Sequence, residues 1–109
     1  MSYSVLAIPN FKKELKKLAK KYPSIKQDLT VLIEELEQNP KKGAPLGNNS
    51  YKIRLAIASK DKGKSGGARV ITNIHISKET IYLLAIYDKS EKANLSKDEL
   101  INLLDHISD

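Results

Sequence analysis

Residues 80–87 (TIYLLAIY) limit the possible folds more than any other stretch, because nearly every one of them is apolar. A strand with one face in solvent alternates apolar and polar residues, whereas a strand covered on both faces can be apolar throughout. We therefore expect this run to be an inner strand of a β-sheet. The charged residues 88–92 (DKSEK) follow it directly, so charge is expected at one end of the sheet.

Two further runs alternate in the way of half-buried strands, residues 51–57 (YKIRLAI) and 68–76 (ARVITNIHI). If they pair as a hairpin, the alternation places Lys52, Arg54 and Arg69 on one face of the sheet, opposite the core. We expect Arg69 to be a surface residue whose removal leaves the stability nearly unchanged. Charged residues are poor strand formers, so an anion-binding face explains these arginines better than solubility does.

The connection between the two runs, residues 60–67 (KDKGKSGG), has no apolar residue and three glycines, which is typical of a loop. It carries three lysines into solvent. Residues 41–69 as a whole hold eight lysines and arginines against one aspartate, and the chain has a net charge of +6. Such a balance favours an anionic partner, of which nucleic acid is the commonest for a small basic domain.

The first forty residues predict a short strand and a helix pair. Residues 3–8 read as a strand that Pro9 stops, and Asn10 is the expected N-cap of the next helix. Pro23 separates two amphipathic helical patterns, which should form an αα-hairpin. The polar side of the first helix carries six lysines: Lys12, Lys13, Lys16, Lys17, Lys20 and Lys21. A solvated face is the usual explanation, and an auxiliary contact to phosphates is the alternative.

The remaining segments complete an α+β domain. Residues 40–50 hold two prolines and two glycines and are expected to connect the helices to the sheet. Ser96 and Glu99 have the spacing of a capping box, so a C-terminal helix should begin there. We predict an N-terminal helix hairpin packed on one face of a small, mainly antiparallel β-sheet, with a C-terminal helix and the other face partly open.

Composition excludes several kinds of site. The chain has no cysteine, and its two histidines, His75 and His106, lie on different predicted elements, so we expect no metal and no cofactor. No apolar run approaches the roughly 20 residues that cross a bilayer, and no signal-peptide pattern is present, which predicts a cytoplasmic protein without a membrane partner. The length of 109 residues predicts one domain, residues 1–109.

Three segments together resemble the RelE/HigB toxins of bacterial type II toxin–antitoxin systems: residues 52–54 (KIR), 60–71 (KDKGKSGGARVI) and 82–92 (YLLAIYDKSEK). The resemblance covers most of the chain and implies a RelE-like fold. It also implies a ribosome-dependent mRNA endonuclease that needs no metal or small-molecule cofactor. Its partners would be the ribosome, the mRNA and a cognate antitoxin that holds it inactive.

The resemblance also implies an active site on the open sheet face. Lys52 and Arg54 match the family's KxK/KxR strand positions, and Arg69 matches the arginine that follows the glycine of the next strand. Lys89 and Lys92 fall in the segment where the family often carries arginines. In such a site the ribose 2′-hydroxyl would attack the adjacent phosphate. The two arginines suit charge stabilisation, and a lysine crowded by other cations can act as base, with Lys52, Lys89 and Lys92 left as alternatives.

Two positions depart from the family pattern. The best-known arginine position holds Ser90, and the acid/base tyrosine aligns near Ser96, so that Tyr87 is only a candidate substitute. The residues expected to bind RNA are Lys60, Lys62, Lys64 and Tyr87. Two other functions remain open: a ParE-like poison of DNA gyrase, which shares the fold, and a nucleic-acid-binding module without catalysis.

Overall fold

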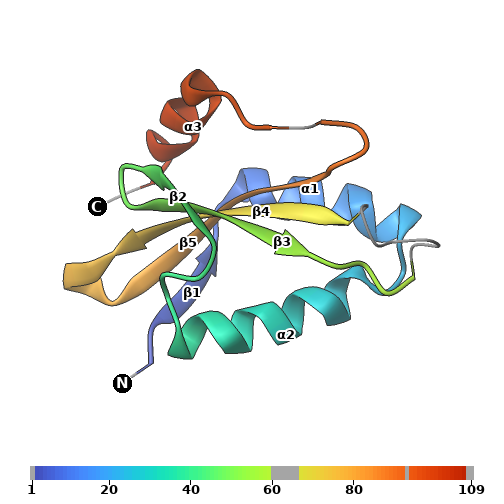
Figure 1. Ribbon diagram of the computed structural model, residues 1–109, viewed down its shortest axis with the longest axis horizontal. Coiled ribbons are helices and arrows are strands. Elements are labelled where there is room, and N and C mark those ends of the chain that lie inside the picture. Colours follow the sequence, from blue (N-terminus) through green and yellow to red (C-terminus); the bar gives the residue numbers. More distant parts are fainter. Residues whose placement is uncertain (1, 60–66, 93, 108–109) are drawn as a thin grey trace.

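The chain folds into a layered α+β structure, shown by a computed structural model that describes residues 2–59, 67–92 and 94–107 (Figure 1). The elements are β1 (Ser4–Ala7), α1 (Pro9–Lys21), α2 (Ile25–Gln38), β2 (Ala44–Gly47), β3 (Ser50–Leu55), β4 (Ala68–His75), the short 3-10 helix η1 (Ile76–Lys78), β5 (Thr80–Asp88) and α3 (Lys97–Leu104). The helix pair α1–α2 packs on the sheet, as predicted for the fold class, and α3 lies across the sheet from α2.

The described strands form one sheet in the order β1-β5-β4-β3-β2. β1 pairs with β5 in parallel, and the other neighbouring strands are antiparallel. β5 therefore lies between β1 and β4, which confirms that residues 80–87 form an inner strand. Eight of its nine residues are buried, as expected for a strand covered on both faces.

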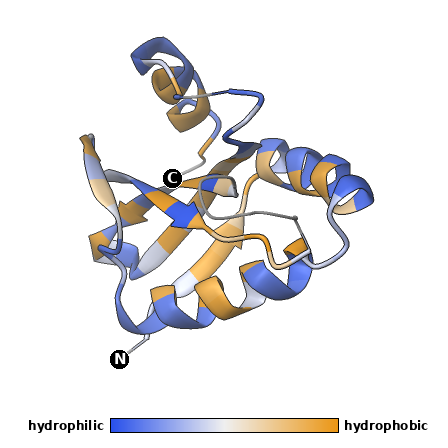
Figure 2. Cartoon of the chain, turned by 45° about the vertical axis from the view of Figure 1, so that its right-hand side comes forward, coloured by the Kyte–Doolittle hydropathy of each residue, from blue (hydrophilic) through white to orange (hydrophobic). Residues whose placement is uncertain are grey.

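The main core lies between the sheet and the first two helices. Each of these helices buries one side, which carries the apolar residues at the predicted helical spacing: Phe11 and Leu18 in α1, and Ile25, Leu29, Leu32 and Leu36 in α2. Figure 2 shows apolar and polar segments alternating along both helices, as expected of helices with one buried side. The prediction of two amphipathic helices is thus confirmed.

A β-bulge in β5 sets the direction of its tyrosines. Ile71 pairs with Ala85 and Thr72 pairs with Leu83, so Leu84 is the extra residue. Side chains normally alternate between the faces of a strand, and an inserted residue shifts that alternation by one. Tyr82 and Tyr87, five positions apart, consequently point to the same face of the sheet.

Two sequence-based expectations were wrong. α1 begins at Pro9 with Ile8 as its N-cap, because proline is well suited to the first helical position, and Asn10 lies inside the helix. The segment from residue 40 to 50 is more than a connection, since it contains β2. A two-residue turn at Asn48 and Asn49, with φ values of 54° and 57°, joins β2 to β3, as in a type I′ hairpin.

Among the described residues, none of the helices is both long enough and apolar enough to span a bilayer.

Replacing Gly43 by alanine is expected to destabilise the protein more than replacing Gly47. Both glycines have a positive φ, 105° and 91°, which costs other residues on the order of 1 kcal/mol or more. A Cβ atom at Gly43 would also lie 2.5 Å from the Lys52 carbonyl oxygen, whereas no described atom lies within 4 Å of one at Gly47. We expect Gly43→Ala to lower the free energy of unfolding by about a further 1 to 3 kcal/mol. Urea unfolding of both variants measures the difference, and equal losses would contradict the close approach.

Candidate functional site

The sheet face opposite α1 and α2 carries a row of three long side chains across neighbouring strands. Arg54 of β3 pairs directly with Arg69 of β4, and Arg69 pairs directly with Tyr87 of β5. Directly paired residues of antiparallel strands point to the same face. Ile53 and Leu55, on either side of Arg54, are buried in the core, so the row points away from it. The prediction that Arg54 and Arg69 share a sheet face is confirmed.

The two arginines of the row differ in exposure. Arg54 is exposed, whereas Arg69 is only 7% exposed and donates from Nη1 to the carbonyl oxygen of Ala68 at 3.3 Å. The expectation that Arg69 is a surface residue was therefore wrong. β4 lies in the middle of the sheet, and the side chains of Arg54 and Tyr87 flank Arg69 on both sides.

The pair of arginines has no described carboxylate beside it. Among the described residues, no ion pair joins either guanidinium to an aspartate or glutamate. Like charges directly opposite each other on neighbouring strands destabilise a sheet. The row is therefore short of negative charge, and an anionic ligand would relieve the repulsion between Arg54 and Arg69.

Lys52 extends this cationic surface along β3. It lies two residues from Arg54 and so points to the same face, and its Nζ donates to Oδ1 of Asn94 at 3.3 Å. An open hollow of about 430 Å³ adjoins it, lined by Lys42, Gly43, Ala44, Lys52, Ile53 and Arg54. Lys52 thus has a neutral partner and open space beside it.

The turn after β5 is fixed by Asp88, which is buried. Its carboxylate accepts hydrogen bonds from the Tyr22 hydroxyl at 2.7 Å and from the backbone and hydroxyl of Ser90 at 2.9 and 2.8 Å. The backbone N–H of Lys89 donates to the carbonyl oxygen of Gly67 at 3.0 Å, while its side chain is exposed. No described contact brings the Lys89 side chain to the arginine row.

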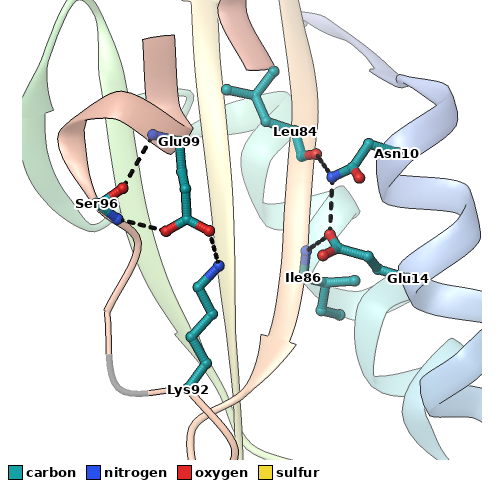
Figure 3. A network of polar contacts seen from close by, with 7 residues as sticks. All are labelled: Asn10, Glu14, Leu84, Ile86, Lys92, Ser96 and Glu99. Carbon is teal, nitrogen blue, oxygen red and sulfur yellow. Dashed lines mark hydrogen bonds and ion pairs between the residues drawn. The ribbon is translucent and has the colours of Figure 1, made fainter. Parts of the chain in front are cut away.

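Lys92 is held by the first turn of α3. Its ammonium donates to Oε2 of Glu99, and it lies 5.4 Å from the centre of the Tyr87 ring. The other oxygen of Glu99 accepts from the backbone N–H of Ser96, whose hydroxyl accepts from the N–H of Glu99 (Figure 3). The predicted capping box is confirmed, and its carboxylate also binds one of the candidate catalytic lysines.

Tyr87 lies beneath this lysine and is only 7% exposed, which leaves little ring surface for stacking on an RNA base. Its hydroxyl makes no hydrogen bond of ordinary geometry with the described residues. Burial raises the pKa of the phenol, while the nearby charge of Arg69 and the Leu95 backbone act in the opposite direction. The hydroxyl therefore keeps its proton at neutral pH.

Asn10 and Glu14 of α1 bind the backbone of β5 from the side (Figure 3). Asn10 Nδ2 donates to the Leu84 carbonyl oxygen and to Oε1 of Glu14, both at 3.0 Å, and the same Oε1 accepts from the Ile86 N–H at 3.1 Å. Burial raises the pKa of Glu14, against the opposing effects of the Ile86 hydrogen bond and of the Lys92 charge.

Sequence reasoning did not assign to the candidate site the polar residues that hold it in place: Asn10, Glu14, Asp88, Asn94 and Glu99. One signal was available, since Glu14 is the only carboxylate in the lysine-rich sequence of α1. The three candidate RNA-binding lysines Lys60, Lys62 and Lys64 lie outside the described residues. Among the described residues, no group of three or more His, Asp or Glu side chains is arranged to hold a metal ion.

Comparisons with known proteins agree with this architecture. A family model described as the RelE toxin of the RelE/RelB toxin–antitoxin system matches residues 10–107. The chain is also similar to a solved structure of the E. coli toxin RelE in the free state, in a mutant with two arginines replaced by alanine. The two are 17% identical, with a TM-score of 0.65 over 99% of this chain and 100% of that one. At that identity the structural likeness concerns the fold.

Glu14 and Glu99 should affect stability with opposite dependence on pH. The native pKa of Glu14 is raised above the usual glutamate value of 4.5, so its contribution is largest below that value and falls as the pH rises through the native pKa. The native pKa of Glu99 is lowered, chiefly by the hydrogen bond from Lys92, so its contribution is present above 4.5 and is lost as the pH falls through the native pKa.

Urea unfolding of the wild type, Glu14→Gln and Glu99→Gln over a pH series measures both effects. As the pH rises, the stability of the wild type relative to Glu14→Gln should fall, and its stability relative to Glu99→Gln should rise. Each glutamine keeps the size of the side chain and one acceptor oxygen, and removes the titration together with the charge. Slopes of the same sign for the two variants would contradict the assignment.

Proposed function

The chain belongs to the RelE toxin family of type II toxin–antitoxin systems, and on that premise we propose that it is a ribosome-dependent endoribonuclease that cleaves mRNA. The observation that carries the proposal is the Arg54–Arg69 pair on the open sheet face, with Lys52 on the same face. Two neighbouring guanidinium groups without a described carboxylate would form a site for a phosphodiester. Among known side chains, arginine matches phosphate oxygens best because its N–H groups form a planar fork.

The proposed reaction is an internal transesterification. A base removes the proton of the ribose 2′-hydroxyl, the oxygen attacks the adjacent phosphorus, and the bond to the 5′-oxygen of the next nucleotide breaks. That oxygen takes up a proton from an acid and leaves as a 5′-hydroxyl, while the other product ends in a 2′,3′-cyclic phosphate. Negative charge grows on the phosphate oxygens in the transition state, where Arg54 and Arg69 would stabilise it.

The contacts of the three candidate lysines favour Lys52 as the base. Lys92 already donates to a carboxylate, and the Lys89 side chain has no described contact with the arginine row. Lys52 lies on the face of the arginine pair, beside an open hollow, and its described partner is the neutral Asn94 amide. A base needs to lie within hydrogen-bond reach of the proton it removes, so its position on this face is the first requirement.

Tyr87 is the candidate acid. Its raised pKa keeps the phenol protonated at neutral pH, which an acid requires. It also adjoins Arg69 in the row, so its hydroxyl and the guanidinium belong to the same part of the face. The hydroxyl is buried, and the Lys92 side chain over the ring would have to shift for the phenol to donate to a leaving oxygen.

The experiment that tests the proposal is toeprinting of mRNA on translating ribosomes with the purified protein. We expect new ends within the translated region that require both the ribosome and the protein, and 2′,3′-cyclic phosphates on the upstream fragments. An intact message would contradict the proposal. A gyrase poison or a non-catalytic binding module would leave the message intact, and supercoiling and RNA-binding assays would then distinguish the two.

Arg54→Ala should lower the rate of cleavage by about 100- to 1000-fold, the usual effect of removing one group that stabilises a transition-state charge. Because Arg54 is exposed, its removal should change the free energy of unfolding by no more than about 0.5 kcal/mol. Single-turnover cleavage and urea unfolding of the same preparation measure the two effects. The matched control is Lys78→Ala, another exposed cation, which should cleave at the wild-type rate.

Arg69→Lys is the companion variant, because alanine at this buried position would also remove packing. Lysine keeps the charge and most of the stem but loses the planar fork. Cleavage should fall by at least about tenfold while the protein stays folded. Full cleavage by both Arg54→Ala and Arg69→Lys would refute the assignment of the site.

Membership of the family implies a cognate antitoxin. We expect it to cover the cationic sheet face with an acidic and apolar segment, because complementary charge speeds association and orients the partner. The association rate measured by stopped flow should fall steeply between about 50 and 500 mM salt, where the Debye length falls below about 10 Å. An association rate independent of salt would contradict charge-driven capture.

A further inference from the structure

Helix α1 presents a second cationic surface, which a single helix forms instead of neighbouring strands. We call it the lysine face, made of six exposed residues: Lys12, Lys13, Lys16, Lys17, Lys20 and Lys21. The only carboxylate in the helix is Glu14, and it is turned inward to the Ile86 N–H. Nothing on α1 itself therefore neutralises the lysine face.

The spacing within the lysine face is unfavourable for an isolated helix. Lys12, Lys16 and Lys20 follow one another at intervals of four residues, and Lys13, Lys17 and Lys21 form a parallel row. Like charges at this interval lie close together and destabilise a helix. Among the described residues, ion pairs to this face involve Lys21 alone, which bonds Glu91 at 3.0 Å and lies 4.0 Å from Asp88.

The surroundings of the lysine face indicate what kind of partner fits it. The apolar side of α1 is used in the core, where Phe11 and Leu18 are buried. The exposed large apolar residues of the described chain lie on other elements: Leu6, Val31, Leu46, Ile76 and Ile101. A protein interface has an apolar centre, and a helix lying on a membrane inserts apolar side chains. The lysine face offers neither.

The chemistry of the lysine face instead suits the phosphodiester backbone of a nucleic acid. All six residues are lysines, which bind phosphates as point charges, and there is no arginine, asparagine or glutamine among them to read base edges. One row of three lysines extends over about 12 Å of helix, from the rise of 1.5 Å per residue. Contacts of this type bind nucleic acid without regard to sequence and release counterions.

We propose that the lysine face of α1 is a second RNA-binding surface, which contacts the phosphate backbone of double-helical RNA and takes no part in cleavage. The inference rests on the proposed function in one respect: if the protein acts on the ribosome, the double-helical RNA is ribosomal RNA. Helix α1 binds the edge of β5, whereas Arg54 and Arg69 lie on β3 and β4, so the two cationic surfaces belong to different elements of the fold (Figure 1).

The test compares two triple variants with the same change of net charge. The first carries Lys12→Gln, Lys16→Gln and Lys20→Gln, which removes one row and leaves the Lys21–Glu91 pair intact. The control carries Lys41→Gln, Lys78→Gln and Lys97→Gln, three exposed lysines outside α1 and far apart in the sequence. Glutamine has nearly the helix propensity of lysine, so folding should be unaffected, and thermal unfolding verifies this.

The first readout is the affinity for a synthetic RNA duplex, measured by fluorescence anisotropy at several salt concentrations. We expect the α1 variant to bind the duplex at least about tenfold more weakly than the wild type at low salt. The slope of log K against log salt should be smaller by about 2 to 3, because each of the three lysines removed accounts for one phosphate contact. The control should stay within about twofold. Equal losses in the two variants would show an effect of net charge and would overturn the proposal.

The second readout separates the lysine face from the cleavage site. With ribosomes, the α1 variant should need at least about tenfold more ribosomes for half-maximal cleavage, while its single-turnover rate at saturation stays within about twofold of the wild type. If the wild type fails to cleave any message, the proposed function fails, and the duplex-binding readout still decides the inference. Unchanged duplex binding by the α1 variant overturns the inference. If anionic vesicles or the antitoxin bind that variant less well while duplex binding is unchanged, the lysine face serves that other partner and the inference is likewise overturned.

Discussion

The structure depends on satisfying the backbone of β5 along both of its edges. β4 pairs with one edge throughout, but β1 is short and pairs only with Thr80–Leu83 on the other. Beyond that point, side chains of α1 bind the backbone of β5. Asn10 donates a hydrogen bond to the carbonyl oxygen of Leu84, and Glu14 accepts one from the N–H of Ile86. A buried backbone group without a partner is costly, so these two bonds fix the first helix against the sheet.

That fixed position explains how two different cationic surfaces coexist. Turning Glu14 inward leaves the outer side of α1 to lysines, while in the sheet the paired strands bring Arg54 and Arg69 together. Lysines on a helix are hydrated and adaptable, whereas an arginine held between Arg54 and Tyr87 in the middle of a sheet has little freedom. The first arrangement suits contact with many phosphates, and the second suits one phosphate held in a defined position.

Patterns of short range could be predicted from the sequence. The alternation in residues 51–57 and 68–76 correctly placed Arg54 and Arg69 on one face, because a strand has a period of two whatever surrounds it. The capping box of Ser96 and Glu99 was predictable for the same reason, since both of its bonds are local. The apolar run of β5 indicated its inner position without showing which strands would flank it.

Features that join distant parts of the chain could not be predicted. Asn10 was a reasonable N-cap by local preference, but its partner is a carbonyl group 74 residues away. The burial of Arg69 depends on Tyr87 in the next strand, and the contact of Lys92 with Glu99 depends on how α3 returns to the sheet. β2 was missed because its four residues include a proline and a glycine, although the following pair of asparagines is compatible with a hairpin turn.

The parallel pairing of β1 with β5 also bears on when the protein becomes a folded toxin. β1 is synthesised before its partner β5, and residues 8–79 lie between them in the sequence. Contacts of such long sequence separation form slowly, because the entropy of closing the intervening loop is lost before the contacts stabilise the fold. A growing chain without β5 lacks both an inner strand of its sheet and Tyr87, so the sheet cannot close before β5 is made. The cationic face that we propose for RNA and for the antitoxin is therefore incomplete until β5 has been translated.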